Sequence, residues 1–544
     1  MFYFADFGHN KKRSFVHDSD AIIVGSGPAG LSAAWPLVEA GLKVLMIDAG
    51  SGDAPFSDFP SGDIGKFRLR ASNWKTRYGT DLSLLGLQGD YSPKLMTPLA
   101  EMVTRKFAEL NGLRAQGFVP IGSMGSGGLS NIWGALSVVF NDADLSEFPF
   151  DRAELDKHYA NIIRRIGLSF GGTIAGTNTD PATPLGRAAE KVFSIHAKIP
   201  LDKDFVLERA SNAVITQDRG DRSACKNCGL CLWGCSHRSI YNSVFELKEL
   251  RQYPNFDFQP FTKAIKLGSN ENLNFVEARG PAQSRIFSAP IIILAAGTIA
   301  TTSLVARKIG YLGRPIRLLS NPAAAIAFVI PRLIGSDLPD HSFSLGQLTY
   351  EMPASTSSCF GVIYGADTLP LDIFASRIPL SRPTALRLSR ALAPALLLAT
   401  CYVPGKFSAN RLYVSASDET PNVLIDGNQT ASAKREIFSA GRSLSSKMRR
   451  RGAFALPGSL TISAPGTDGH YAGTLPMGGK GDLATSLYGE LNASKGIYIA
   501  DGASFSSLPA KHCTLTIMAN ADRIGRHLIS KIAMRAQTKR NLSV

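Results

Sequence analysis

The chain has 544 residues, 44% hydrophobic and 19% charged, which is globular composition and excludes intrinsic disorder. At this length two or more domains are expected. The formal charge of +15 comes from 59 basic and 44 acidic residues, but no helix-turn-helix, zinc-finger or RNA-binding signature accompanies it, so we expect no nucleic-acid partner.

Residues 1–20 predict no export signal. They carry charges and lack the continuous apolar stretch that a signal peptide needs. We therefore expect a cytoplasmic protein.

Residues 20–48 have the strand–turn–helix–strand pattern of a dinucleotide site. An apolar run at 20–24 is followed by the sequence GSGPAG and then by a helical stretch. Gly25 permits the tight turn, Gly27 lets the backbone approach a pyrophosphate, and Gly30 lets the helix pack on the strand. The helix N-terminus offers unpaired N–H groups to the phosphates. The expected contacts of this turn are Gly25, Gly27, Pro28, Ala29 and Gly30.

The second strand, at 43–47, ends in Asp48, whose carboxylate can accept hydrogen bonds from ribose hydroxyls. The position of the site near the start of the chain favours FAD over NAD. Pro36 falls inside the helix and is expected to kink it.

Four of the seven cysteines lie within one short run, with the spacing C-x2-C-x2-C-x3-C. These are Cys225, Cys228, Cys231 and Cys235. Tetrahedral zinc usually draws two pairs that lie farther apart, and disulfides are disfavoured in a cytosolic setting. The spacing matches the ferredoxin run, although Ser236 stands where proline usually follows. We therefore favour an iron–sulfur cluster over zinc and over disulfides.

The most apolar segment, 391–403, is shorter than the ~20 residues of a spanning helix and contains Pro394. We expect it to be buried core. Three arginines precede it, Arg382, Arg387 and Arg390. They would also permit a helix that lies on a membrane surface, so a peripheral membrane contact stays open.

Four further stretches carry motifs: GSGGLSNIWG at 125–134, IIILAAGTIAT at 291–301, HYAGTLPMG at 470–478 and IYIADGAS at 497–504. Together with the first glycine loop, in this order, they resemble the glucose–methanol–choline (GMC) family of FAD-dependent oxidoreductases. The family's second catalytic position, His or Asn, falls on His512, and its T-x-T on 514–516. The resemblance extends from residue 20 to about residue 530. The departures are Asp48 where Glu is commoner, Leu475 where Cys is common, and His512 where many relatives have Asn.

The resemblance implies bound FAD and an alcohol-oxidising site. It adds these expected cofactor contacts: Gly127, Gly128, Ser130, Asn131, Ala296, Gly297, Asp501, Gly502 and Thr514. It also implies that His470 is the base for the substrate hydroxyl and that His512 bonds the substrate oxygen. Histidine suits the base because its ordinary pKa of ~6.5 lies near working pH.

Bacterial glucose and fructose dehydrogenases carry a similar cysteine loop followed by a similar Tyr-Asn pair, here Tyr241-Asn242. In those relatives the loop holds a cluster that drains electrons from the flavin. We therefore expect a dehydrogenase with a [3Fe-4S] or [4Fe-4S] cluster and an external electron acceptor. The alternative is an oxygen-using alcohol oxidase with a structural cysteine loop. The GGLSN loop resembles enzymes encoded with polysaccharide pathways and favours a sugar or glycoconjugate substrate.

The expected fold is α/β, with a Rossmann-like FAD-binding domain and a second, antiparallel-sheet substrate domain. Because the cofactor motifs are spread along the chain, the FAD domain must be discontinuous. Its expected ranges are 15–60, 100–145, 205–310 (with the cysteine loop at 223–242) and 465–540. Residues 145–205 and 310–465 form the expected substrate domain, with candidate strands at 315–319 and 411–415. Two rival classes are a non-redox flavoprotein lyase of the same fold and an electron-transfer subunit without turnover.

Overall fold

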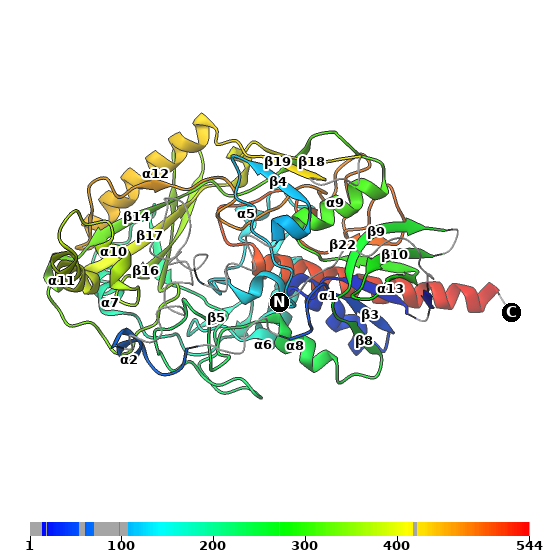
Figure 1. Ribbon diagram of the computed structural model, residues 1–544, viewed down its shortest axis with the longest axis horizontal. Coiled ribbons are helices and arrows are strands. Elements are labelled where there is room, and N and C mark those ends of the chain that lie inside the picture. Colours follow the sequence, from blue (N-terminus) through cyan, green and yellow to red (C-terminus); the bar gives the residue numbers. More distant parts are fainter. Residues whose placement is uncertain are drawn as a thin grey trace.

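The computed structural model describes residues 14–17, 19–53, 60–69, 97, 107–270, 273–416 and 422–542. Two large sheets lie at opposite ends of an elongated molecule (Figure 1). One sheet is parallel and carries the dinucleotide motif, and the other is antiparallel. The predicted combination of a Rossmann-like domain with a separate antiparallel sheet is confirmed.

The parallel sheet has five strands in the order β22-β12-β2-β3-β8. These strands are β22 (Ile497–Ile499), β12 (Ile291–Leu294), β2 (Ala21–Val24), β3 (Val44–Ile47) and β8 (Phe256–Gln259). Every position of β2, β3, β12 and β22 is buried, because both faces of the sheet are covered. Parallel pairing therefore joins four stretches that lie far apart in the sequence, and it aligns the carboxyl ends of their strands at one edge.

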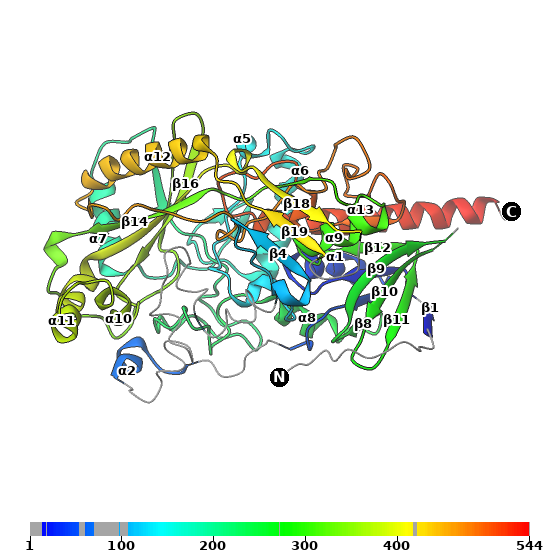
Figure 2. The same cartoon turned by 45° about the horizontal axis from the view of Figure 1, so that its top comes forward.

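Helices α1 (Pro28–Glu39) and α13 (Thr514–Leu542) pack together on one face of this sheet (Figures 1 and 2). Helix α1 continues through Pro36 and ends three residues later, at Glu39. Gly525 of α13 lies against this turn, where a Cβ atom would come within 2.7 Å of both Pro36 Cγ and Ala33 O. Glycine at 525 therefore allows α13 to pack closely at Pro36.

The other face of the parallel sheet is covered by a four-stranded sheet and one helix. The strands are β1 (Ser14–His17), β9 (Lys263–Ser269), β10 (Asn274–Arg279) and β11 (Ser284–Ala289), and the helix is α9 (Thr298–Lys308). Helix α9 begins directly after the turn that follows β12.

The antiparallel sheet has seven strands. They are β7 (Val206–Arg209), β14 (Ala323–Val329), β15 (Leu348–Pro353), β16 (Ser358–Gly365), β17 (Leu396–Tyr402), β20 (Phe454–Ala455) and β21 (Thr461–Ile462). Helices α7 (Arg187–His196) and α12 (Ala431–Arg449) contribute to one apolar cluster with it. The apolar segment 391–403 supplies β17, so the prediction of buried core is confirmed.

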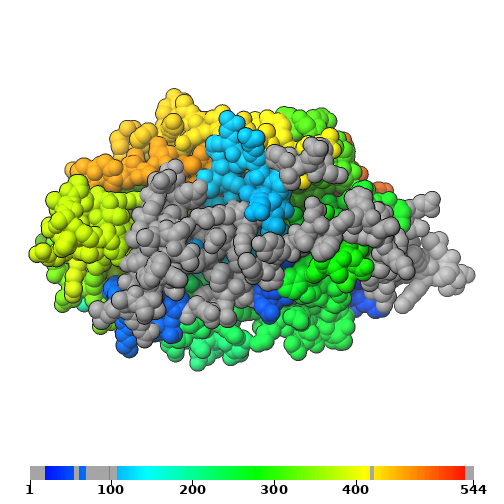
Figure 3. Space-filling view, viewed as in Figure 1, coloured from blue at the N-terminus to red at the C-terminus, as the bar shows by residue number. Residues whose placement is uncertain are grey.

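A further four-stranded sheet joins β13 (Ile316–Leu318), β18 (Asn410–Val414), β19 (Val423–Asp426) and β4 (Leu113–Gln116). Both strands expected at 315–319 and 411–415 are present. In the space-filling view the cyan segment that contains β4 reaches the surface beside the yellow strands (Figure 3). Strand β7, which falls in the range 205–310 expected for the FAD domain, instead pairs with β15 of the antiparallel sheet. The domain ranges otherwise stay a prediction.

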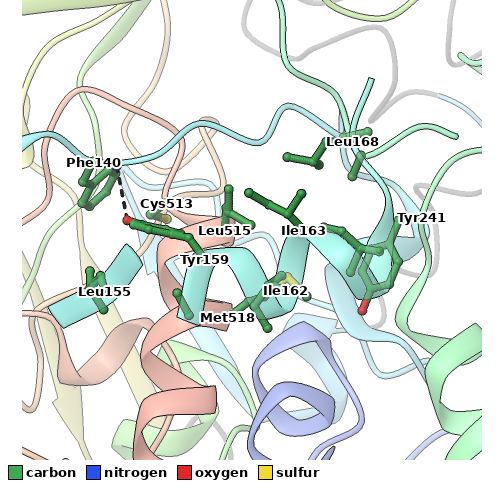
Figure 4. Packing of buried hydrophobic residues seen from close by; sticks show 14 of the residues in the cluster. Phe140, Leu155, Tyr159, Ile162, Ile163, Leu168, Tyr241, Cys513, Leu515 and Met518 are labelled. Atoms are coloured by element: carbon green, nitrogen blue, oxygen red, sulfur yellow. Dashed lines mark hydrogen bonds between the residues drawn. The ribbon is translucent and has the colours of Figure 1, made fainter. Parts of the chain in front are cut away.

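Helix α6 (Arg152–Ile166) packs against the first turns of α13 in the cluster of Figure 4. The Tyr159 hydroxyl lies 2.8 Å from Thr516 Oγ1 and accepts from the N–H of Phe140 at 3.3 Å. These contacts fix the start of α13, and therefore the segment just before it, where His512 lies. The shorter elements are α2 (Ile64–Leu69), α5 (Asp142–Leu145), β5 (Thr173–Ile174), β6 (Thr177–Asn178), α8 (Ser243–Leu250), α10 (Leu371–Ala375) and α11 (Arg382–Leu392).

Candidate active site

The turn between β2 and α1 has the close contacts that its glycines allow. Gly25 has φ +104°, and a Cβ there would lie 2.5 Å from Ala295 O. A Cβ at Gly30 would lie only 1.9 Å from Gly25 O, so the helix could not start this close to the strand with any other residue. Pro28 occupies the first position of the helix, with Ala29 and Gly30 next in the first turn.

The loop at 125–131 lies against this turn. The N–H of Gly127 donates to Ser26 Oγ at 3.1 Å, and a Cβ at Gly128 would lie 3.3 Å from Gly27 Cα. The space at Gly27 itself is open, since the nearest atom to a Cβ there is Gly128 Cα at 3.9 Å. The two glycine loops therefore form a cradle beside the N-terminus of α1, which fits the pyrophosphate of a dinucleotide.

Ser130 and Asn131 brace the second loop from within. Ser130 Oγ donates to Gly127 O at 2.6 Å, and Asn131 Nδ2 donates to Ser126 O and Gly128 O at 2.9 and 2.8 Å. Asn131 Oδ1 accepts from Asn242 Nδ2 at 2.7 Å, so the Tyr-Asn pair after the cysteine loop holds the cofactor loop in place. These side chains shape the cradle, and their predicted contact with the cofactor stays a prediction.

Asp48 lies at the end of β3, as expected, but its oxygens are held by the protein. Oδ2 accepts from the Ser26 N–H at 2.7 Å and from Ser26 Oγ at 2.8 Å, and Oδ1 accepts from the Gly50 N–H at 2.7 Å. Burial raises the pKa of this carboxyl, and these hydrogen bonds oppose the rise. The structure therefore shows Asp48 fixing the glycine turn, and the ribose contact remains a prediction.

Asp501 joins the segments at the carboxyl ends of β12 and β22. Its Oδ2 accepts from the Gly297 N–H at 2.9 Å and from Thr301 Oγ1 at 2.6 Å, and Oδ1 accepts from the Ala503 N–H at 3.0 Å. Burial raises the pKa of Asp501 to about 6. Ala296 and Gly297 form the turn into α9, and Gly502 lies so close to Tyr471 that a Cβ would be 2.5 Å from the Tyr471 carbonyl oxygen.

That contact brings the HYAGTLPMG block to the same edge of the parallel sheet, together with His470. The His470 and His512 rings face each other, with centroids 4.5 Å apart and planes at 71°. Tyr402, at the end of β17, lies 5.9 Å from the His470 ring and 5.2 Å from the His512 ring. Phe360 of β16 lies 6.0 Å from the His512 ring. The structure therefore brings both predicted catalytic histidines together where the antiparallel sheet meets the parallel one, beside an aromatic wall.

Both imidazoles are in the uncharged form that a general base requires. The His470 side chain is 12% exposed, and burial lowers its pKa to about 4. Burial, and then the neighbouring His470, lower the pKa of His512 well below its ordinary value. Nδ1 of each ring is buried and has no hydrogen-bond partner among the described residues, which leaves Nε2 as the nitrogen available to a substrate.

The sequence interpretation missed Asp468 and Asn321. Asp468 Oδ2 accepts from the Asn321 N–H at 2.8 Å and from the His470 N–H at 3.2 Å, and it lies 3.9 Å from His470 Nδ1. Burial raises the pKa of Asp468 to about 7. Asp468 could have been suspected because it stands two residues before the histidine, whereas nothing in the sequence points to Asn321.

Thr514 is the first residue of α13, two residues after His512. The cysteine loop lies elsewhere, between α2 and the cluster around α6. Cys231 is buried in that cluster, Cys225 packs against it, and the Cys228 carbonyl accepts from the Ile64 N–H at 2.8 Å. The ring of Trp233 lies against that of Phe67 in α2, with the ring centroids 4.7 Å apart and the planes tilted by 58°.

The four thiols of this loop lie close to one another. Burial, and after it the neighbouring thiols, raise the pKa of Cys225 to about 11 and that of Cys231 to about 12, and burial also raises the pKa of Cys228. All seven cysteines are free of disulfides. Within the described residues, no three His, Cys, Asp or Glu side chains converge as ligands of a single metal ion. A cluster places irons and sulfides between its thiolates, so the loop still fits the donor set of a cluster.

Comparisons with known proteins point to one class. Residues 23–82 match the family model of an NAD(P)-binding Rossmann-like domain. Paromamine 6'-oxidase of Streptomyces fradiae is 23% identical over 538 residues, which is 95% of this chain and 92% of that protein. Thiamine thiazole synthase of Aeropyrum pernix is 63% identical over 30 residues only, 6% of this chain and 11% of that protein. The solved structure of pyridoxine 4-oxidase from Mesorbium loti has a TM-score of 0.60 at 14% identity, over 94% of this chain and 99% of that one.

The site and the relatives together define an FAD-dependent oxidoreductase. The site consists of the cradle of two glycine loops and the histidine pair at the edge of the parallel sheet. Among FAD-dependent oxidoreductases, two findings point to one family. These are the order of the motifs and the match over 95% of this chain to paromamine 6'-oxidase, itself a GMC enzyme. These findings support a place for the chain in the glucose–methanol–choline oxidoreductase family, which its motifs resemble.

Proposed function

We propose that the protein oxidises a CH–OH group of a sugar or glycoconjugate, with His470 as the base and His512 as a hydrogen-bond donor to the substrate oxygen. The observation that carries the proposal is the buried, neutral His470–His512 pair with centroids 4.5 Å apart. When bound, FAD supplies the acceptor for the hydride.

The residues of the chain then have separate tasks. His470 Nε2 accepts the hydroxyl proton, which makes the carbinol carbon a better hydride donor. His512 donates from Nε2 to the same oxygen, so the carbinol carbon is held in one orientation. The two rings thus act as opposite tautomers, with the proton on Nδ1 in His470 and on Nε2 in His512.

The sugar assignment rests on two supports. The relatives that match over most of the chain are named for oxidation of paromamine and of pyridoxine, both of them polar molecules that carry hydroxyl groups. The wall beside the histidines is aromatic, from Tyr402, Phe360 and Tyr364, which share one apolar cluster. Flat aromatic faces suit the C–H faces of a sugar ring, while the histidines take its hydroxyl group.

The cysteine loop supports a second part of the proposal, that Cys225, Cys228, Cys231 and Cys235 hold an iron–sulfur cluster that passes electrons to an external acceptor. All four thiols share one loop and are not joined by disulfides. The N–H of Asn227 donates to Cys225 Sγ at 3.4 Å, the type of contact that tunes a cluster. The competing function is an oxygen-using oxidase with a structural cysteine loop, which the names of both relatives favour.

We also propose a cytoplasmic protein that can touch an anionic membrane surface. Its seven free cysteines suit a reducing compartment. No described helix has both the length and the apolar character of a membrane crossing. Helices α10 and α11 form the end of the molecule opposite the C-terminus (Figures 1 and 2). Leu388 of α11 is 39% exposed, and Leu380, between the two helices, is 54% exposed. Ile334 is 48% exposed, and the N–H of its neighbour Gly335 donates to the Ala391 carbonyl of α11. Arg387 and Arg390 of α11 are exposed, and so is Arg332, two residues before Ile334.

Sedimentation with vesicles tests the membrane part. The protein should bind vesicles that contain phosphatidylglycerol and not pure phosphatidylcholine, and Leu380→Asp with Leu388→Asp should abolish binding. Equal binding to both lipids, or none to either, would contradict it.

One anaerobic experiment tests the main proposal. Purified protein is mixed with paromamine, glucose and pyridoxine in turn, and flavin absorbance is followed before and after air is admitted. Bleaching by a sugar or amino sugar supports CH–OH oxidation and excludes the lyase and the non-catalytic subunit. Electron paramagnetic resonance and iron analysis of the same sample decide between the cluster and the oxidase.

A further inference from the structure

Two buried polar atoms beside the candidate base have no partner. His470 Nδ1 and Asp468 Oδ1 are both buried and make no hydrogen bond to any described residue. The other carboxylate oxygen of Asp468 lies 3.9 Å from that same Nδ1. Buried polar atoms are normally paired, so an orphaned acceptor beside an orphaned ring nitrogen needs an explanation.

The carboxylate is held in a fixed position by its surroundings. Oδ2 accepts from the backbone N–H groups of Asn321 and His470. The Asn321 side chain in turn donates to Val403 O at 3.1 Å and Pro509 O at 2.8 Å, which ties this point to the end of β17 and to the segment that leads to His512. Asp468 is therefore anchored to the elements that carry Tyr402 and His512.

Among the described groups around the Asp468 carboxylate, His470 is the one that can become its positively charged partner. The described titratable groups near it are His470, His512, Tyr402, Tyr471 and Cys513. Tyrosine and cysteine side chains this deeply buried stay neutral, since burial raises the pKa of Tyr402 and of Cys513 to about 12. Only an imidazole can bring a positive charge to Asp468, and His470 is the one within 4 Å.

We propose that Asp468 is the positioning residue of His470: its carboxylate accepts the Nδ1–H, so that the Nε2 lone pair faces the substrate. The proposal rests on the proposed function of His470 as the base. When Nε2 takes the hydroxyl proton, the ring becomes an imidazolium whose charge the carboxylate balances, and Asp468 itself neither gains nor loses a proton. A hydrogen bond of this kind is often long in the absence of substrate and tightens when the substrate binds.

Asp468 also resolves a difficulty in the acid–base chemistry. Burial alone lowers the pKa of His470 to about 4, and an imidazole that acidic is a weak base at neutral pH. A carboxylate within about 4–6 Å favours the protonated ring and raises its pKa again. Asp468 has that effect only while it is ionised, which couples the two groups.

Asp468→Asn removes the negative charge and keeps an oxygen that can accept from the backbone N–H groups of Asn321 and His470. It therefore tests the charge separately from these hydrogen bonds. The measurement is histidine-ring NMR of the FAD-bound protein between about pH 3 and about pH 8, a range that includes the pKa of about 4 to which burial lowers His470. The His470 signal is assigned from its loss in His470→Gln. We expect the His470 titration to move to lower pH in Asp468→Asn. Asp180→Asn is the matched control, since Asp180 is also buried and accepts a backbone N–H, from Thr216 at 3.0 Å, but lies away from the histidines.

An unchanged His470 titration in a folded, FAD-bound Asp468→Asn protein would overturn the proposal, as would an equal shift in Asp180→Asn. Because this measurement needs no substrate, its result is independent of whether the sugar assignment is right. With a sugar that bleaches the wild-type flavin, Asp468→Asn should also lower the rate of flavin reduction by at least about tenfold while KM changes little. Loss confined to KM would assign Asp468 to substrate binding instead.

Discussion

Gly27 and Gly128 meet across the cofactor cradle, with the space around Gly27 bounded only by Gly128 Cα at 3.9 Å from a Cβ position. The two residues come from loops about one hundred positions apart in the chain. A side chain at either position would fill space that the cofactor needs.

Gly27→Val should therefore abolish FAD binding while the protein still folds. A Cβ at position 27 would meet no protein atom closer than Gly128 Cα at 3.9 Å, so we expect the valine side chain to occupy the place of the pyrophosphate. Flavin absorbance after purification measures occupancy, and circular dichroism measures folding. Gly30→Ala is the contrasting control, since its Cβ would lie 1.9 Å from Gly25 O and should destabilise the fold itself. Full flavin occupancy in a folded Gly27→Val protein would refute the assignment of this turn.

The rate of flavin reduction should rise with pH and reach a plateau. Proton acceptance requires unprotonated His470, whose pKa burial lowers to about 4, and ionised Asp468, whose pKa burial raises to about 7. Lowering the pH adds protons to this coupled pair. The rate of flavin reduction should therefore decrease as the pH is lowered from about 7 to about 4. Stopped-flow reduction at a series of pH values measures this decrease. A rate that falls as pH rises from 5 to 8 would have the wrong sign.

Cys231→Ser should remove iron from anaerobically prepared protein, because a serine oxygen is a much poorer ligand than a thiolate. Flavin reduction by substrate should survive, since the histidine pair lies on other segments. Reoxidation by the physiological acceptor should collapse. Cys359→Ser is the control, because this buried cysteine of β16 lies outside the loop. Wild-type protein without iron or acid-labile sulfide would favour the oxygen-using oxidase.

The glycine turn could be predicted from the sequence because its geometry admits few residue types, and the histidine pair because the motifs around it resemble those of the GMC family. The side-chain partners could not be predicted. Asp48 has the expected position after β3, yet its carboxylate oxygens accept hydrogen bonds from Ser26 and Gly50. Which groups donate to Asp48 depends on how the neighbouring turns fold over each other. Asp468 depends on Asn321, which lies 147 positions earlier in the chain.

Strand β7 shows the same limit for the fold. Two of its four residues, Val206–Arg209, are exposed, and the stretch carries no signal for a partner strand. Position along the chain suggested the FAD domain, whereas tertiary pairing with β15 decides its place. Short strands are therefore assigned to a sheet only once the tertiary contacts are known.

The central claim is that His470 accepts the substrate proton. The most direct test is anaerobic stopped-flow reduction of the flavin by a sugar that the wild-type protein oxidises, compared with His470→Ala. We expect full FAD occupancy in His470→Ala. We also expect flavin reduction to be slower by about two to four orders of magnitude, because that is the usual contribution of a general base. A loss of less than about tenfold at full FAD occupancy would show that the base is another residue.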